Sequence, residues 1–156
     1  MYPQTQTTYT DRQTLASIDV RHTGRHRELK AISIRQPWAW AILHAGKDIE
    51  NRSWNTYYRG ELLIHASGNL DREHLGWPRS VRLPDLQDLA RGAIVGVVEL
   101  VDVVEKSRSK WFSGPYGFVL TNPRPFSKPA PCKGAHKLWD APPEVWRAIR
   151  RQLRAA

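Results

Sequence analysis

The longest apolar run, residues 93–104 (AIVGVVELVDVV), limits the possible folds of this chain more than any other segment. It is rich in β-branched valine and isoleucine, which favour a strand over a helix. Gly96 favours a bulge, or a bend at which a sheet curls into a barrel. Glu99 interrupts the run, so it either points outward, the commoner case, or is buried beside a cation. The run therefore predicts a β-rich fold built around one long strand.

A strand, a helix and a second strand are expected around the first tryptophans. An alternating segment at 31–34 predicts a short strand, and a helix follows from Pro37. Proline suits the first turn of a helix, and Gly46 suits the position just past its end. The remaining expectations are strands at 58–66 and 116–121, a short helix at 84–90, and a last helix opened by Pro142-Pro143.

Prolines restrict residues 122–134. Pro123, Pro125, Pro129 and Pro131 lack the amide hydrogen that a central strand must donate. This segment should therefore run extended or at the edge of a sheet.

Length and composition fit one globular domain. The chain has 156 residues, of which 40% are apolar and 25% charged. We divide it into a flexible N-terminal arm (1–29), a folded domain (30–140) and a basic C-terminal helix (141–156) that packs on or extends the domain. No run approaches the ~18 apolar residues that span a membrane. A single cysteine, Cys132, allows no internal disulfide, so the expected location is cytoplasmic.

The charge balance points to polyanionic partners. Lysine and arginine outnumber the acids 24 to 15, which gives a formal charge of +9 and a pI near 10.1. Basic domains often bind nucleic acids, because neutralising phosphates releases counterions. A merely soluble basic protein is the alternative.

Familiar catalytic patterns are missing from the sequence. It has no glycine-rich phosphate loop, no hydrolase serine elbow, and no histidines or cysteines at metal-ligand spacing. We expect no cofactor, with a divalent metal only if the protein is a nuclease. Any enzymatic chemistry would use lysine, carboxylate, arginine, tyrosine or hydroxyl groups.

Polar residues flank the predicted helix at both ends. Arg35-Gln36 precede it, and Lys47, Glu50 and Arg52 follow it. If both groups point into one cleft, they form a binding site. A strand would send Glu50 and Arg52 to the same side, where they could make a salt-bridged floor with Lys47. The alternative is that Glu50 and Arg52 only pair to hold the barrel together.

Several tryptophans adjoin the predicted loops. Aromatic faces stack on unpaired bases, which makes them candidates for the wall of a cleft. Trp54, Trp111 and Trp139 are the better candidates. Trp38 and Trp146 lie on apolar helix faces, where packing explains them, although Trp38 is also among the candidate ligand contacts.

The segment SIRQPWAWAILHAGKDIENR resembles the opening of an ASCH domain, the activating-signal-cointegrator homology module. The family pattern of Gly-Lys, then Glu, then Arg is met by Gly46, Lys47, Glu50 and Arg52. The similarity covers about residues 30–140, and it continues in YRGELLIHAS, AIVGVVELVDV, Tyr116-Gly117-Phe118, Lys133-Gly134 and Leu138-Trp139. It implies an α+β, β-rich PUA-like fold: a small bent β-barrel of about five to six strands, with a helix after the first strand and a C-terminal helix.

The resemblance also implies nucleic-acid binding. We expect RNA, another single-stranded nucleic acid or a modified nucleoside to bind in a basic, aromatic-walled cleft. The candidate contacts are Arg35, Gln36, Trp38, Lys47, Glu50, Arg52, Trp54, Arg59, Trp111 and Tyr116.

Two other functions stay open. Some ASCH proteins are ribonucleases or amidohydrolases of acylated cytidine, so a hydrolase could use Lys47 with Glu50 or Glu99. In the amidohydrolase type a threonine nucleophile stands three residues after the lysine, where this chain has Glu50, which cannot form an alkoxide. The third function is a protein-interaction module built on the basic last helix.

Overall fold

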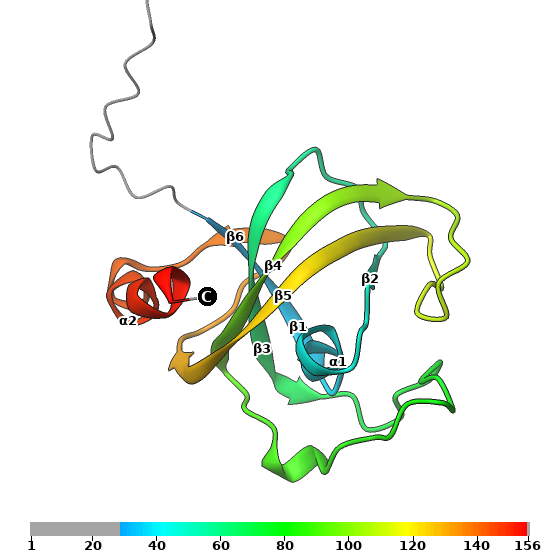
Figure 1. The fold of residues 1–156 in the computed structure, drawn as a ribbon, viewed down its shortest axis with the longest axis horizontal. Coiled ribbons are helices and arrows are strands. Elements are labelled where there is room, and N and C mark those ends of the chain that lie inside the picture. The colour runs from blue at the N-terminus through cyan, green and yellow to red at the C-terminus, as the bar shows by residue number, and fades with distance from the viewer. Residues whose placement is uncertain (1–28, 156) are drawn as a thin grey trace, which may run out of the picture.

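A computed structural model describes residues 29–155, so nearly all of the predicted N-terminal arm lies outside the described residues. Six strands form one strongly bent mixed sheet with the order β2-β5-β4-β3-β1-β6 (Figure 1). The elements are β1 (Lys30–Gln36), α1 (Trp38–His44), β2 (Ile49–Arg52), β3 (Gly60–Leu70), the 3₁₀ turn η1 (Leu86–Asp88), β4 (Ala93–Val104), β5 (Tyr116–Pro131), β6 (Leu138–Asp140) and α2 (Pro143–Arg154). This α+β architecture confirms the predicted fold class, and the sheet curls without closing within these residues.

Strand β4 lies at the centre of the sheet and has the predicted bounds. It pairs with β3 on one side and with β5 on the other, antiparallel in both cases. The register shifts at Gly96, as a bulge there predicts. A Cβ on Gly96 would lie 2.8 Å from both the Arg124 carbonyl oxygen and the Leu43 side chain. Glycine therefore lets β4, β5 and α1 meet closely.

Strand β5 changes its role along its length. Its first residues, 116–119, pair with β2 as well as with β4. Its proline-rich half, 122–131, pairs with β4 and has no second strand partner among the described residues. The prediction that this half is extended and at an edge is confirmed.

Two local predictions differ from the structure, and one strand was missed. Strand β3 begins at Gly60 and continues to Leu70, because it pairs in parallel with all of β1. Strand β6 was not predicted, since three residues are too short to show a period; its position comes from pairing with β1. The helix expected at 84–90 is the single turn η1, whose Asp85 side chain accepts a hydrogen bond from the Gln87 amide.

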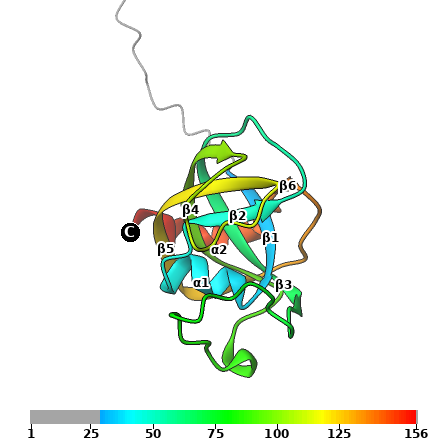
Figure 2. The ribbon, with the colours of Figure 1, turned by 90° about the vertical axis from the view of Figure 1, so that its right-hand side faces the viewer.

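The two helices pack against opposite faces of the sheet, because alternate residues of a strand point to opposite sides. On β3, Leu62 and Ile64 join the core beneath α1, whereas Leu63 joins a second core. Val145 and Ile149 of α2 complete that second core. In Figure 2, α1 lies in front of the sheet, α2 lies behind it, and the segment 71–92 passes below α1. Neither helix of the described residues is long and apolar enough to span a membrane.

Candidate functional site

The turn after α1 positions the Gly-Lys-Glu-Arg residues. Gly46 has a φ of +70°, a left-handed conformation that glycine adopts without strain. The Lys47 amide then donates to the Ala41 carbonyl over 3.0 Å, which holds the chain against the helix end. Strand β2 follows at once, so Lys47 and Glu50 are placed by the helix end and the first residues of β2.

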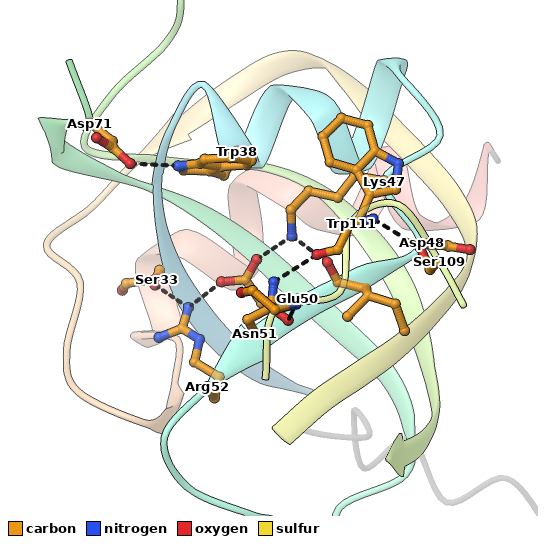
Figure 3. Close-up of polar contacts among 12 residues, drawn as sticks. Ser33, Trp38, Lys47, Asp48, Glu50, Asn51, Arg52, Asp71, Ser109 and Trp111 are labelled. Carbon is orange, nitrogen blue, oxygen red and sulfur yellow. Dashed lines mark hydrogen bonds and ion pairs between the residues drawn. The ribbon is translucent and has the colours of Figure 1, made fainter. Parts of the chain in front are cut away.

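Lys47, Glu50 and Arg52 form the predicted row of ion pairs (Figure 3). Lys47 is 3% exposed and Glu50 8% exposed. The Lys47 ammonium donates to a Glu50 carboxylate oxygen over 2.6 Å and to the Ile49 carbonyl. The other Glu50 oxygen lies 3.2 Å from Arg52 Nη2, which also donates to the Ser33 carbonyl over 2.8 Å. Glu50 therefore has a cation on each side.

Burying these charges costs free energy. The effective penalty for removing an ion from water is several kcal/mol, and pairing often does no more than offset it. A net stabilisation of the barrel is therefore a weak explanation for the pair. A few convergent polar groups in a largely apolar hollow are what ligand-binding sites commonly contain, so the pair is a candidate site.

A hollow of about 430 Å³ opens above this pair. The volume falls within the range of small-molecule sites, roughly 300–1,000 Å³. Its lining comes from α1, β2 and three loops, and consists of Trp38, Lys47, Glu50, Asn51, Leu75, Gly76, Lys110, Trp111, Phe112 and Ser113.

Trp38 and Trp111, which line this hollow, pack together with Trp77. The ring centroid of Trp38 lies 5.2 Å from that of Trp77 and 6.4 Å from that of Trp111. The Lys47 ammonium is 5.8 Å from the Trp38 ring centroid, within cation–π range. Trp111 is buried, and its Nε1 has no hydrogen-bond acceptor among the described residues. The wall is therefore aromatic and contains one unused donor.

Asp71 holds the Trp38 ring in place. The indole Nε1 donates to the Asp71 carboxylate over 2.8 Å (Figure 3). Burial acts to raise the Asp71 pKa. Hydrogen bonds from Trp38 and from the backbone amides of His74 and Glu73, together with the charge of Arg35, outweigh it and hold the pKa below its ordinary value. The carboxylate is thus charged when it accepts the indole hydrogen bond.

Asn51 points to the other side of β2 and fixes the loop that carries Trp111. Its Nδ2 donates to the Trp111 carbonyl over 2.8 Å. Its Oδ1 accepts from the amides of Ser113 (2.8 Å) and Gly114 (3.1 Å). One side chain therefore links the strand to one wall of the hollow.

Four of the ten predicted contact residues line the hollow: Trp38, Lys47, Glu50 and Trp111. Arg52 contacts the hollow's floor through Glu50. The polar groups at the two ends of α1 do not open onto one cleft, contrary to the expectation. The Gln36 amide donates to the Ala90 carbonyl over 3.0 Å and lines a separate hollow of about 410 Å³, while Arg35 is exposed on β1.

The other candidates lie elsewhere. Trp54 packs edge-on against Phe118, with centroids 5.1 Å apart. Arg59 is exposed and lies 3.6 Å from the Asp102 carboxylate. Tyr116 is half-buried against the core beneath α1. Glu99 is exposed on β4, so it points outward and does not line the hollow.

Sequence reasoning missed several residues of the site. Leu75, Gly76 and Trp77 belong to the segment 71–92, whose polar sequence, interrupted by glycine and proline, predicts a surface loop. Its packing against α1 brings it to the site. Lys110, Trp111 and Phe112 could have been predicted to form part of the site, because a basic loop is followed directly by two aromatic residues there. Within residues 29–155, no cluster of three or more histidine, cysteine or acidic side chains is arranged to hold a metal ion.

Comparison with known proteins relates the chain to one family. The model of the ASCH domain family matches residues 32–130. Activating signal cointegrator 1 from Homo sapiens is 27% identical over 138 residues, an alignment that covers 78% of this chain and 24% of that protein. The Mus musculus protein of the same name matches to the same extent. The chain thus spans about a quarter of the length of these relatives.

One solved structure supports the fold. The crystal structure of a ZmASCH mutant protein from Zymomonas mobilis matches with a TM-score of 0.52 and 14% identity. The match covers 80% of this chain and 98% of that chain. At this identity the similarity concerns the fold.

Proposed function

The chain belongs to the ASCH domain family, and from that premise we propose that it binds RNA or a base-modified nucleoside by taking one base into the hollow above Lys47 and Glu50. The observation that carries the proposal is the buried ion pair at the floor of an aromatic-walled hollow. Arg52 supports that floor from the side.

The walls suit a flat, uncharged ring. Trp38, Trp111 and Phe112 border the hollow, and Leu75 at its mouth is 79% exposed, unusual for a leucine. A base stacked on an aromatic side chain gains roughly 1–3 kcal/mol, whichever base it is. Stacking therefore supplies affinity without selecting a sequence.

The floor suits the edge of a base. Glu50 is an acceptor for an exocyclic amino group. Lys47 has three N–H groups, of which two are used within the described residues, so one is left for a carbonyl oxygen. An adjacent donor and acceptor match a base that carries both groups on one edge, as cytosine does.

The rim supplies positive charge for phosphates. Lys110 is exposed, lies 5.9 Å from the Trp111 ring centroid and lines the hollow. Lys106 and Arg108 are exposed on the same loop. A strand entering the hollow would therefore place its backbone beside Lys110, on a loop that carries two further cations.

The test measures the affinity of short single-stranded RNA by fluorescence anisotropy at several salt concentrations. Lys110→Gln should weaken binding and reduce the slope of log K against log salt by about 0.7. Phe112→Ala should weaken binding by about tenfold, as expected for lost stacking. The matched control is Arg91→Gln, which removes one positive charge from an exposed site that does not line the hollow.

Absent salt-dependent binding, or equal effects of Lys110→Gln and Arg91→Gln, would overturn the proposal. Competition with free nucleosides, including acetylated cytidine, then identifies the base. A nucleoside that displaces RNA from the wild type should fail to do so in the Phe112→Ala variant.

A hydrolase is the second candidate, favoured by the 2.6 Å contact between two buried groups inside the hollow. Hydrolysis would add water across a P–O or acyl C–N bond, and the leaving atom would take a proton. Only the Lys47–Glu50 form of this candidate fits the lining of the hollow, because Glu99 is elsewhere. Incubation with labelled RNA and with acetylated cytidine, followed by mass spectrometry, should show product with the wild type and not with Lys47→Met. Unchanged substrates with the wild type leave binding as the function.

A further inference from the structure

Helix α2 carries a row of four arginines on its outer face. Arg147, Arg150, Arg151 and Arg154 follow the spacing i, i+3, i+4, i+7, which places them on one side of a helix. All four are exposed. The opposite face is buried through Val145 and Ile149. We call these four residues the arginine row.

The arginine row is not explained by helix stability. Like charges three or four residues apart each destabilise a helix by about 0.2–0.5 kcal/mol, and the row contains four such pairs. The helix dipole favours cations in the last turn, which accounts for Arg151 and Arg154 but not for Arg147. None of the four forms an ion pair with another described residue.

The fold holds α2 firmly, so the row is presented in a fixed orientation. Gln152 donates to the Lys128 carbonyl over 2.8 Å, and its oxygen accepts from the Lys128 amide over 3.0 Å. These bonds tie the helix to the edge of β5. A hollow of about 550 Å³ lies at this junction, and Arg151, Pro123 and Pro125 are among the residues that line it.

We propose that the arginine row is a second nucleic-acid surface, which binds the phosphodiester backbone without selecting bases. One guanidinium group can donate two parallel hydrogen bonds to two oxygens of the same phosphate, a geometry that lysine cannot provide. From Arg147 to Arg154 the helix rises about 10 Å, a length over which a polynucleotide carries several phosphates. The proposal extends the proposed function to longer ligands but does not require capture of a base.

Burial of the apolar face of α2 argues against a membrane as the partner. An amphipathic helix binds a bilayer by inserting its apolar face. Here Val145 and Ile149 are 3% and 0% exposed, because they belong to the core. Only the charged side is available, which suits a hydrophilic polyanion.

The two surfaces are separate. Figure 1 shows α2 and β2 on opposite sides of the molecule, and no residue lines both hollows. A trinucleotide should therefore occupy one surface at a time. A strand long enough to reach both should bind more tightly through its raised effective concentration at the second surface.

The test compares a trinucleotide with a long single-stranded RNA in salt titrations of the full chain. The double variant Arg147→Gln/Arg151→Gln should reduce the slope of log K against log salt for the long RNA by about 1.4. Binding of the trinucleotide in the hollow should stay unchanged. The matched control is Arg72→Gln/Arg91→Gln, which removes the same charge from exposed residues that line neither hollow.

Replacing two arginines of the row by lysine separates the effect of positive charge from that of guanidinium hydrogen-bond geometry. Arg147→Lys/Arg151→Lys should keep the salt slope and lose part of the affinity, because the paired contacts to phosphate are lost. All these positions are exposed, so the thermal midpoint should stay at or above that of the wild type.

Equal salt slopes in the arginine-row and control variants would overturn this inference and leave the hollow's function intact. Conversely, loss of long-RNA binding in the arginine-row variant, with Lys110→Gln and Phe112→Ala silent, would support the arginine row and reject the hollow. The inference would also be overturned if the arginine-row variant bound RNA as tightly as the wild type but lost binding to a polyglutamate peptide or to phosphatidylserine vesicles.

Discussion

Asn51 shows how one side chain that is not charged or aromatic shapes the hollow. It lies between Glu50 and Arg52 in sequence but faces the other way, where it holds the loop that carries Trp111. The ion pairs of the floor and the aromatic wall are thus built from the two faces of one short strand. A change at Asn51 should alter the wall and leave the floor in place.

We expect Asn51→Ala to lower the free energy of unfolding by about 1–3 kcal/mol, because three hydrogen bonds are lost. Urea unfolding measures this change. Hydrogen exchange at the Ser113 and Gly114 amides should speed up more than exchange in β4. Asn69→Ala, at an exposed position, is the control. Unchanged exchange at the two amides would show that the loop does not depend on Asn51.

Among single residues, the sequence predicted the ones whose positions are set by nearby residues in the chain. Lys47 and Glu50 are placed by the end of α1 and by β2, so their spacing is informative. Leu75 and Lys110 reach the same hollow from loops more than twenty residues further along the chain. No local period encodes such an approach, because it depends on how the loops pack against α1.

At the scale of elements, one close approach lies where the paired strands β4 and β5 pass beneath α1. Gly96 sits at this point, and both the Arg124 backbone and the Leu43 side chain occupy the space that a Cβ would need. A backbone atom cannot move aside as a flexible side chain can. The separation of the three elements therefore depends on this glycine.

The comparison of Gly96→Ala with Gly68→Ala tests this dependence. Gly96→Ala should destabilise the protein by about 1–3 kcal/mol, the usual cost of overpacking a core. Gly68→Ala should be close to neutral, because nothing lies within 4 Å of its added Cβ. Urea unfolding midpoints at equal m-values measure both. Similar midpoints for the two variants would mean that β4, β5 and α1 can move apart enough to accept the added methyl group.

Elements were predictable where composition alone decides them. The β-branched residues of β4 and the prolines of β5 each exclude most alternatives. Strand β6 and the parallel pairing of β1 with β3 were not predictable, since each depends on a partner distant in sequence. The helix expected at 84–90 was wrong because the period of so short a segment is not decisive.

For the molecule as a whole, we expect the stability near neutral pH to depend on His65, which lies in β3 and is 2% exposed. Its Nε2 lies 2.9 Å from the Cys132 carbonyl, and its Nδ1 has no partner among the described residues. Burial lowers the His65 pKa below 6.5 and outweighs the hydrogen bond to Cys132, which acts to raise it. The folded protein therefore binds this proton less readily than the unfolded chain.

Stability should consequently be greatest above the unfolded pKa of His65 and fall as pH drops below about 6.5 towards the folded pKa. Urea unfolding between about pH 7.5 and about pH 5 gives the slope, and NMR titration of the ring gives the folded pKa. Asp71 acts in a lower window, because the stability that its lowered pKa contributes is lost only once pH falls below 3.8. A His65 pKa at or above 6.5 would contradict the prediction.

The proline-rich half of β5 also bears on how these molecules behave at high concentration. An open sheet border normally offers amide donors on which another copy can add a strand, the first step of fibre growth. Here Pro123, Pro125, Pro129 and Pro131 remove four of those donors from the stretch 122–131. Polymerisation by strand addition is therefore discouraged along this border, which leaves the nearby arginine row clear for its ligand.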